Sequence, residues 1–267
     1  MKARPQKNRK QFNNNLKPKH MSTHAEIKQL LKDDDAYYRG IGRQYLSNSD
    51  IGILLSNPQA YGLPSEDKKH FVEGKLFHRL LIEPDKVEEI VFVDVSTRNT
   101  KEYKKFVEEN GLEFALLKKE VDDIYRLARI VKSNISFYDE IYNPGNKYEE
   151  AEVGVIKDTQ WKGKADIVCK DFIIDLKTTS DINKFRYSSR AYNYDSQAYI
   201  YQMLFGKPLV FYVVDKETGQ LGRFTPTQNF IESGERKVER AIEVWRKYFS
   251  PSKTDDIENY FIDDYLD

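Results

Sequence analysis

Alternation of apolar and polar positions predicts two adjacent strands in the middle of the chain. Residues 164–169 alternate and are rich in Ile and Val, and residues 172–177 begin with the apolar run Phe-Ile-Ile. The two residues between these segments form a tight turn, so we expect an antiparallel pair. The second strand ends in Asp-Leu-Lys. Because strand side chains alternate between faces, Asp175 and Lys177 point the same way.

The rest of the pattern mixes strands with amphipathic helices. Short apolar runs predict strands at 90–93, from Glu152 onward, at 208–215 and at 221–225. Stripes at helical spacing predict helices at 27–32, from Ser47 or Ser49 to 56, and at 66–82, 101–109, 118–134, 187–205 and 228–249. The sequence therefore predicts an α/β fold with a central mixed sheet flanked by helices.

Two carboxylates are expected to meet on the central strands. Asp166 lies on the first strand, where antiparallel pairing brings it beside Asp175. Two carboxylates that close repel each other unless a cation or a proton lies between them. Oxygen ligands of this kind are those that Mg²⁺ prefers. A magnesium site at the end of this strand pair is the resulting hypothesis.

Composition narrows the class of protein. The 267 residues suit one large domain, and 43 basic against 43 acidic residues give a net charge of zero. That balance argues against a generally basic DNA-coating protein, although a local basic groove is compatible with it. The single cysteine, Cys169, excludes an internal disulfide and an iron–sulfur cluster and suits the cytoplasm. No apolar run approaches the ~20 residues of a membrane span.

The two ends of the chain differ from the middle in charge. Residues 1–25 hold seven Lys or Arg and no acid, which predicts a disordered basic arm. That arm is either a solvated tail or a source of phosphate contacts on DNA. Residues 26–250 are expected to form a single domain. Residues 251–267 form an acidic tail with aromatics, either loosely docked or able to bind a basic partner or mask the protein's own groove.

The central motif resembles that of a known nuclease superfamily. The pattern Gly-x-x-Asp, a spacer and Asp-Leu-Lys-Thr-Thr is similar to the core of PD-(D/E)XK nucleases. The match is carried by Gly163, Asp166, Asp175, Lys177, Thr178 and Thr179. The later Gln197-x-x-x-Tyr201 resembles a helix of the branch that contains RecE-type and lambda exonucleases. Together with His78 and Glu152, the matching series spans about half of the chain.

The resemblance implies a restriction-endonuclease-like fold and a set of metal ligands. Asp166 and Asp175 would be the main ligands, with the backbone carbonyl of Leu176 as a further one. Gly-x-x-x-His-x-Leu-Leu resembles the motif that lends a histidine, here His78, to the metal site. Imidazole tolerates Mn²⁺ as well as Mg²⁺. The alternative for His78 is a structural histidine packed on its helix.

Catalytic roles follow from the same resemblance. Lys177 would orient or deprotonate the attacking water and offset negative charge in the transition state. Glu152 is preferred over its neighbours Glu149 and Glu150 because its interval to Asp166 resembles that of the family. It would assist the metal directly or through water, and a solvent-facing strand glutamate is the alternative.

Residues after the central motif are candidates for contacts with substrate. Tyr194, Gln197 and Tyr201 fall on one helix face, where Gln197 could hold the attacking water or a phosphate oxygen and Tyr201 could bond a phosphate. The preceding segment is expected to be a loop whose cationic and aromatic groups suit a frayed DNA end. Its cationic candidates are Lys184, Arg186 and Arg190.

The function implied by the resemblance is a metal-dependent DNA exonuclease. It would act 5′→3′ on the ends of linear double-stranded DNA and leave 3′ single-stranded tails for recombination. Such enzymes are usually phage-borne, often form homo-oligomeric rings and work beside a single-strand annealing protein. The alternatives are an endonuclease or structure-specific nuclease on the same core, and a DNA-end-binding recombination module that has lost catalysis.

Overall fold

A computed structural model describes residues 23–63 and 69–262. Within them, one mixed sheet of five strands has the order β3-β4-β5-β6-β7. The strands are β3 (Lys147–Ile156), β4 (Thr159–Val168), β5 (Ile173–Thr179), β6 (Leu209–Asp215) and β7 (Leu221–Phe224). All neighbours are antiparallel except β5 and β6, which are parallel and joined by a helical crossover. The predicted antiparallel pairing of the central strands is confirmed.

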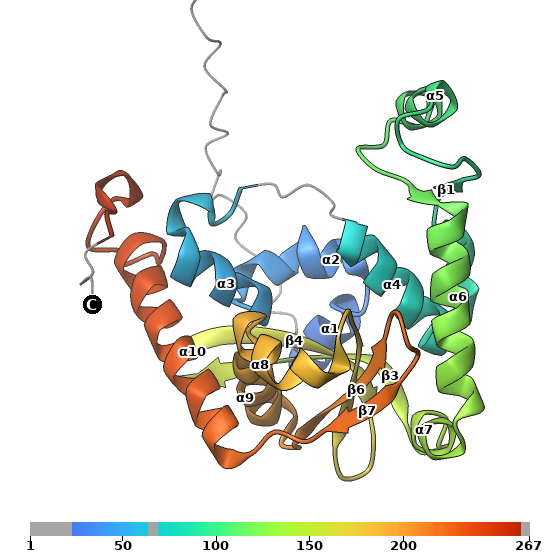
Figure 1. The fold of residues 1–267 in the computed structure, drawn as a ribbon. Helices are drawn as coiled ribbons and strands as arrows, with labels where there is room; N and C mark the ends of the chain where they lie inside the picture. The colour runs from blue at the N-terminus through green and yellow to red at the C-terminus, as the bar shows by residue number, and fades with distance from the viewer. Residues whose placement is uncertain (1–22, 64–68, 263–267) are drawn as a thin grey trace, which may run out of the picture.

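Helices cover both faces of this sheet (Figure 1). On one face, α4 (Lys69–Ile82) and α6 (Lys118–Ser133) bury their apolar stripes against β5 and β6. On the other face, α9 (Tyr194–Phe205) packs on the strands, and α3 (Asn48–Ser56) and α10 (Gln228–Tyr248) pack on α9. The fold is therefore α/β, a mixed sheet flanked by helices, as the sequence predicted.

The N-terminal segment docks on strand β3. It comprises α1 (His24–Leu30), α2 (Asp34–Tyr38) and the 3₁₀ turn Ile41–Gln44. Leu31 and Tyr37 are buried against Ala151 and Val153 of the strand. Lys162 of β4, itself buried, donates to the Tyr37 carbonyl at 2.5 Å. This segment is thus part of the folded body from Thr23 onward, and the remainder of the predicted basic arm, residues 1–22, lies outside the described residues.

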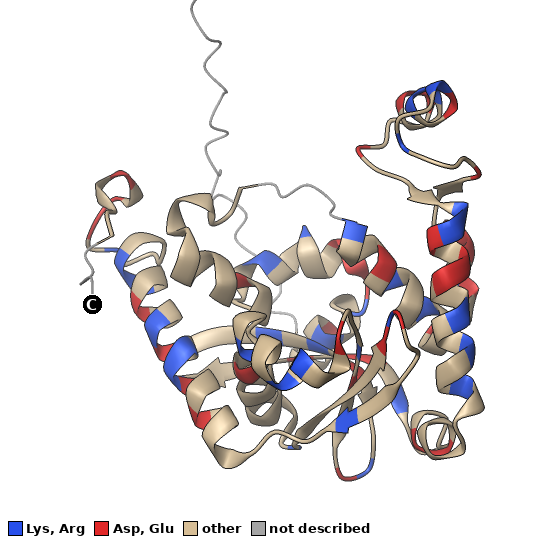
Figure 2. Ribbon diagram, viewed as in Figure 1, with Lys and Arg blue, Asp and Glu red and all other residues tan. Residues whose placement is uncertain are grey.

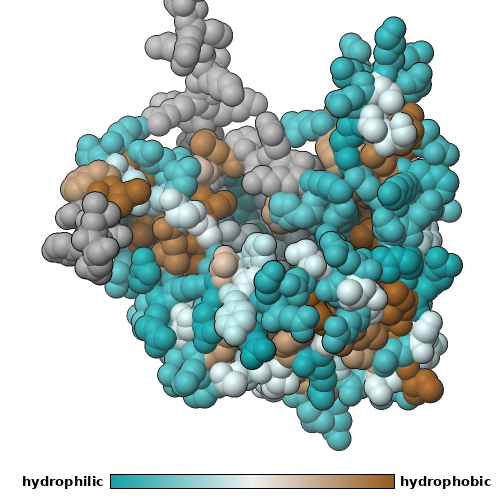
Figure 3. Space-filling model, in the orientation of Figure 1, coloured by the Kyte–Doolittle hydropathy of each residue, from teal (hydrophilic) through white to brown (hydrophobic). Residues whose placement is uncertain are grey.

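A small appendage projects from the body beside α6 (Figure 1). It holds the parallel strands β1 (Phe92–Val93) and β2 (Leu116–Leu117) and the helix α5 (Lys101–Glu109). Tyr103 and Ala115 belong to its own small core. Much of the surface seen in Figure 3 is hydrophilic, with apolar patches that include the region of α7 (Ile135–Ile141).

Several predicted elements differ from the structure. Strand β3 begins at Lys147 and not at Glu152, and helix α1 lies at His24–Leu30 instead of 27–32. Residues 135–141 form the separate helix α7, which begins at the N-cap Asn134. The predicted helix 187–205, with the loop before it, is instead α8 (Phe185–Ala191) followed by α9. The break is Asn193, whose φ of 58° is left-handed, a conformation that cannot continue an α-helix and in which asparagine is enriched. Of the acidic tail, Tyr260 packs edge-on against Tyr248, and residues 263–267 lie outside the described residues.

No helix in the described part of the chain combines the length and the apolar character needed to cross a lipid bilayer.

Candidate metal and catalytic site

The site lies where strands β4 and β5 separate. Their ladder consists of the pairs Ile167↔Ile174 and Val168↔Ile173. Beyond it, the Asp166 carboxylate replaces a backbone acceptor, because the Leu176 N–H donates to Asp166 Oδ2 at 2.7 Å. A side chain that closes a fork between strands is fixed in direction. The fork therefore holds a buried carboxylate at the point where the two interior strands separate.

Asp175, which is buried, and Lys177, which is partly buried, form an ion pair at this fork. Lys177 Nζ lies 2.5 Å from Asp175 Oδ2, and Asp175 is only 2% exposed. The Gln197 amide of α9 donates to Asp175 Oδ1 at 2.6 Å, and the Tyr194 ring centroid lies 5.0 Å from Lys177 Nζ. Burial lowers the pKa of Lys177, but the charge of Asp175 outweighs it, so the net pKa lies above its usual value. The lysine is thus held as an ammonium ion.

His78 reaches the fork from helix α4. Its Nε2 lies 2.8 Å from the Leu176 carbonyl oxygen, which can only accept, so Nε2 carries the proton. In the neutral ring, Nδ1 then presents a lone pair 3.4 Å from Asp166 Oδ1. Burial, with the charge of Lys177, lowers the pKa of His78 and favours that neutral form. Both Nδ1 and the Asp166 carboxylate are then acceptors, so a cation or a proton between them would satisfy both.

Glu149 of β3 completes the cluster. Among the described residues, ligand atoms of His78, Glu149 and Asp166 all lie within 4.8 Å of one another. Burial, and then the charge of Asp175, raise the pKa of Asp166 to about 8; burial, and then the charge of Asp166, raise that of Glu149 to about 7. A bound divalent ion would remove that repulsion, and one imidazole with two carboxylates is a ligand set for Mg²⁺ or Mn²⁺. The residues present therefore fit a metal of this class.

Backbone geometry places Glu149, rather than Glu152, at the cluster. The pairs Tyr148↔Ile167 and Glu150↔Ala165 flank Glu149, so the register aligns it with Asp166. Its φ of 50° is left-handed, an uncommon conformation that clusters at functional sites. Glu152 lies opposite Gly163, about 10 Å farther along the strand, and its carboxylate contacts His24 and Lys28 instead. Glu149 is one of the two neighbours over which the sequence favoured Glu152.

Three of the remaining predicted residues, Tyr194, Gln197 and Tyr201, lie on α9 and face the sheet. The Tyr201 hydroxyl donates to the Lys164 carbonyl at 2.8 Å, so its hydrogen bond goes to the backbone. A Cβ at Gly163 would lie 2.5 Å from the Tyr201 ring, so glycine permits this approach. The Leu176 carbonyl, predicted as a ligand, is engaged by His78 in the structure.

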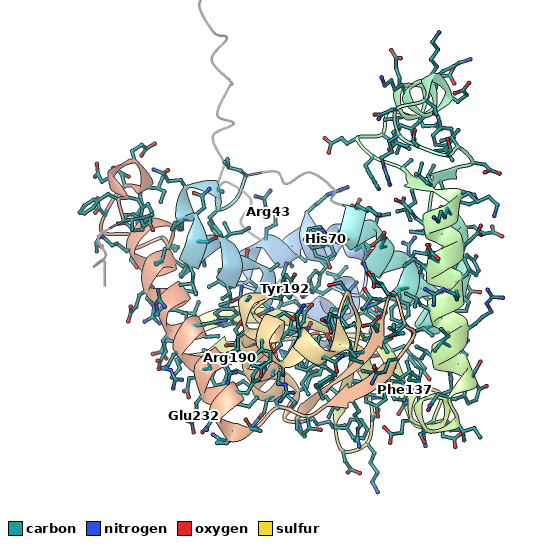
Figure 4. The ribbon with its side chains drawn as sticks, in the orientation of Figure 1. Arg43, His70, Phe137, Arg190, Tyr192 and Glu232 are labelled. Carbon is teal, nitrogen blue, oxygen red and sulfur yellow. The ribbon has the colours of Figure 1, made fainter. Side chains whose placement is uncertain are left out.

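The predicted DNA-contacting cations lie on or beside helix α8, which carries basic residues on the face seen in Figure 2. Lys184, Arg186 and Arg190 are all exposed, as is Tyr187. Arg190 lies over the Phe230 ring of α10 at 5.1 Å, and in the view of Figure 4 Tyr192 lies between Arg190 and the pair Arg43 and His70. Two residues separate α8 from Tyr194, whose ring centroid lies 5.0 Å from Lys177 Nζ, so this surface lies near the partly buried Lys177.

Comparisons with known proteins agree with the fold. A "putative exonuclease" from Eubacterium rectale has a crystal structure that superposes with a TM-score of 0.61 at 15% identity, covering 88% of this chain and 96% of that one. The solved structure of SSO0001 covers 66% of this chain and 85% of that one at 14% identity, and its TM-score of 0.32 is too low to support an argument. No curated protein matches the chain. Residues 56–259 match the family described as "PDDEXK-like domain of unknown function (DUF3799)", and the chain therefore belongs to that family.

Proposed function

We propose that this protein is a divalent-metal-dependent deoxyribonuclease that hydrolyses phosphodiester bonds. The observation that carries the proposal is the set of ionisable side chains at the fork of β4 and β5, of which Asp166 and Asp175 are buried and the others are partly buried. There Asp166, Glu149 and His78 converge beside the Asp175–Lys177 ion pair. Burying this many ionisable groups costs folding free energy, and such clusters are concentrated at sites of chemistry.

Each residue has a definite task in this proposal. Asp166, Glu149 and His78 would hold the ion, and Asp175 could join them because Gln197 and Lys177 fix its two oxygens. A bound divalent ion lowers the pKa of a water and stabilises charge on the phosphoryl group. Lys177 would donate hydrogen bonds to the attacking water or to a phosphoryl oxygen. Because its pKa is raised, it serves as a cationic donor and not as the general base.

We further propose exonuclease action, 5′→3′ on the ends of linear double-stranded DNA, leaving 3′ single-stranded tails for recombination. Two arguments support it: the resemblance of the Gln197-to-Tyr201 helix to RecE-type exonucleases, and the name of the Eubacterium rectale protein, a "putative exonuclease". The exposed cations Lys184, Arg186 and Arg190 beside the site suit a DNA backbone. A homo-oligomeric ring and a single-strand annealing partner belong to the same proposal.

The decisive experiment compares linear with covalently closed circular duplex DNA in Mg²⁺ and in EDTA. We expect nucleotides to be released from the linear substrate only, with metal present, and a 5′ end label to be released first. Lys177→Met should lower the rate by about 10²–10³-fold. Lys216→Met is the matched control, because Lys216 pairs with Glu73 away from the fork, and it should retain the wild-type rate.

The other outcomes of this assay separate the alternatives. Cleavage of the circular substrate would replace exonuclease action with endonuclease action on the same site. Binding of DNA ends without any metal-dependent hydrolysis would identify a recombination module that lacks catalysis. Equal rates for wild type and Lys177→Met would refute the assignment of this site.

A further inference from the structure

A second lysine lies at the site and is shared between two acids. Lys164, on β4 two residues before Asp166, has a side chain only 9% exposed. Its Nζ lies 2.5 Å from Asp34 Oδ1 and 3.5 Å from Glu149 Oε2. One of these acids belongs to the metal cluster, whereas the other belongs to the N-terminal segment. The ammonium would therefore compete with a divalent ion for the Glu149 carboxylate.

Asp34 is equipped to hold that ammonium. It begins helix α2, and its other oxygen, Oδ2, lies 3.1 Å from Lys75 Nζ of α4. Although burial acts in the opposite direction, the hydrogen bond from Lys164 lowers the pKa of Asp34 to about 2. Asp34 thus stays ionised at neutral pH, and it is the nearer of the two acids to Lys164.

The other acid, Glu149, lies farther from Lys164. Its Oε2 is 3.5 Å from the ammonium, and its carboxylate converges with His78 and Asp166. If Asp34 did not hold Lys164, the ammonium could close that distance and pair with Glu149. An ammonium on Glu149 would oppose a divalent ion at the same oxygens.

From this arrangement we infer that Asp34 is a positioning residue for the metal site. It draws the Lys164 ammonium away from Glu149 and so leaves the Glu149 carboxylate free to bind a divalent ion. The inference rests on the proposed function, because it assumes that His78, Glu149 and Asp166 hold the ion. Asp34 precedes residues 56–259, the part of the chain that matches the family. The N-terminal segment, to which the family match does not extend, would thus set the metal affinity of the matched domain.

The test is a titration of the full chain with Mn²⁺ in the absence of DNA. The electron paramagnetic resonance signal of unbound Mn²⁺ measures how much of the ion is bound. We expect Asp34→Asn to weaken Mn²⁺ binding by about tenfold, because Lys164 then pairs with Glu149 alone. Adding Lys164→Met to that variant removes the competing ammonium and should return the affinity to within about threefold of wild type.

A matched control separates this effect from loosening of the N-terminal segment. Lys32 belongs to the same segment and pairs with Glu150 of β3 at 2.6 Å, away from the metal cluster. Lys32→Met should bind Mn²⁺ as wild type does. Equal weakening by Lys32→Met and Asp34→Asn would overturn the inference, as would failure of Lys164→Met to restore binding.

Two further outcomes keep the inference distinct from the proposed function. Wild type that binds Mn²⁺, with an unchanged affinity in Asp34→Asn, would overturn the role of Asp34 and leave the nuclease proposal intact. Wild type that binds no Mn²⁺ would overturn both, because the cluster would then not be a metal site.

Discussion

Substituting Asp166 by asparagine should stabilise the metal-free protein. The pKa of Asp166 rises from 3.8 to about 8, first through burial and then through the charge of Asp175. At about pH 7 the folded chain therefore retains a proton that the unfolded chain has lost. About three pH units at ~1.4 kcal/mol each correspond to roughly 4 kcal/mol of lost stability.

The sign of the pH dependence follows from the direction of the shift. A carboxyl whose folded pKa is raised contributes no penalty below its unfolded pKa, near 4, and a growing penalty as the pH rises toward its folded pKa, near 8. Asparagine cannot ionise, and its Oδ1 can still accept from the Leu176 N–H. In EDTA, we expect Asp166→Asn to raise the free energy of unfolding by about 2–4 kcal/mol at about pH 8, and by much less at about pH 5.

Urea unfolding in EDTA at these two pH values measures the effect. Asp171→Asn, in the exposed turn of the same hairpin, is the matched control and should change stability little at either pH. Mg²⁺ should stabilise wild type at the higher pH and leave Asp166→Asn unaffected. An Asp166→Asn variant that is no more stable than wild type at about pH 8, or whose gain does not shrink on acidification, would refute the reasoning.

Two other substitutions test how the helices are held against the sheet. Gly163→Ala should lower the free energy of unfolding by about 1–3 kcal/mol, because its Cβ would meet the Tyr201 ring. The control, Gly74→Ala on α4, has open space around its Cβ and should be neutral or slightly stabilising. Urea unfolding measures both, and the reverse order of stabilities would contradict the packing described. Lys237→Met should cost about 3–5 kcal/mol, since Asp195 is fully buried and pairs with Lys237 at 2.8 Å. Thermal unfolding that changes by less than a few degrees would show that this pair contributes little.

The elements with strong local patterns were predictable. Helix 101–109 is found with the predicted bounds, and helix α3 begins after its N-cap Ser47 and ends at Ser56, as predicted. The hairpin that carries Asp166 and Asp175 was predictable because alternation and turn residues act over a few positions. These features depend on interactions between residues near in sequence.

The parts that were missed depend on distant contacts. Glu149 reaches the cluster because β3 aligns it with Asp166 and because its backbone is left-handed. Neither fact is visible in a run of three nearby glutamates. The break between α8 and α9 at Asn193 carried a weak local signal, since asparagine tolerates that conformation. It is fixed by distant groups, however: Asn48 donates to the Asn193 carbonyl, and Lys237 donates to its side chain.

The fork between β4 and β5 gives Asp166 two separate reasons to persist. Its carboxylate accepts the hydrogen bond of the Leu176 amide in place of a backbone carbonyl, and an apolar substitute would leave that buried donor without an acceptor. A descendant of this protein that had abandoned hydrolysis would therefore be expected to retain Asp or Asn at this position on architectural grounds. Lys177 closes no such gap, and so the lysine is the better diagnostic of activity when relatives of this chain are sorted into working and silent forms.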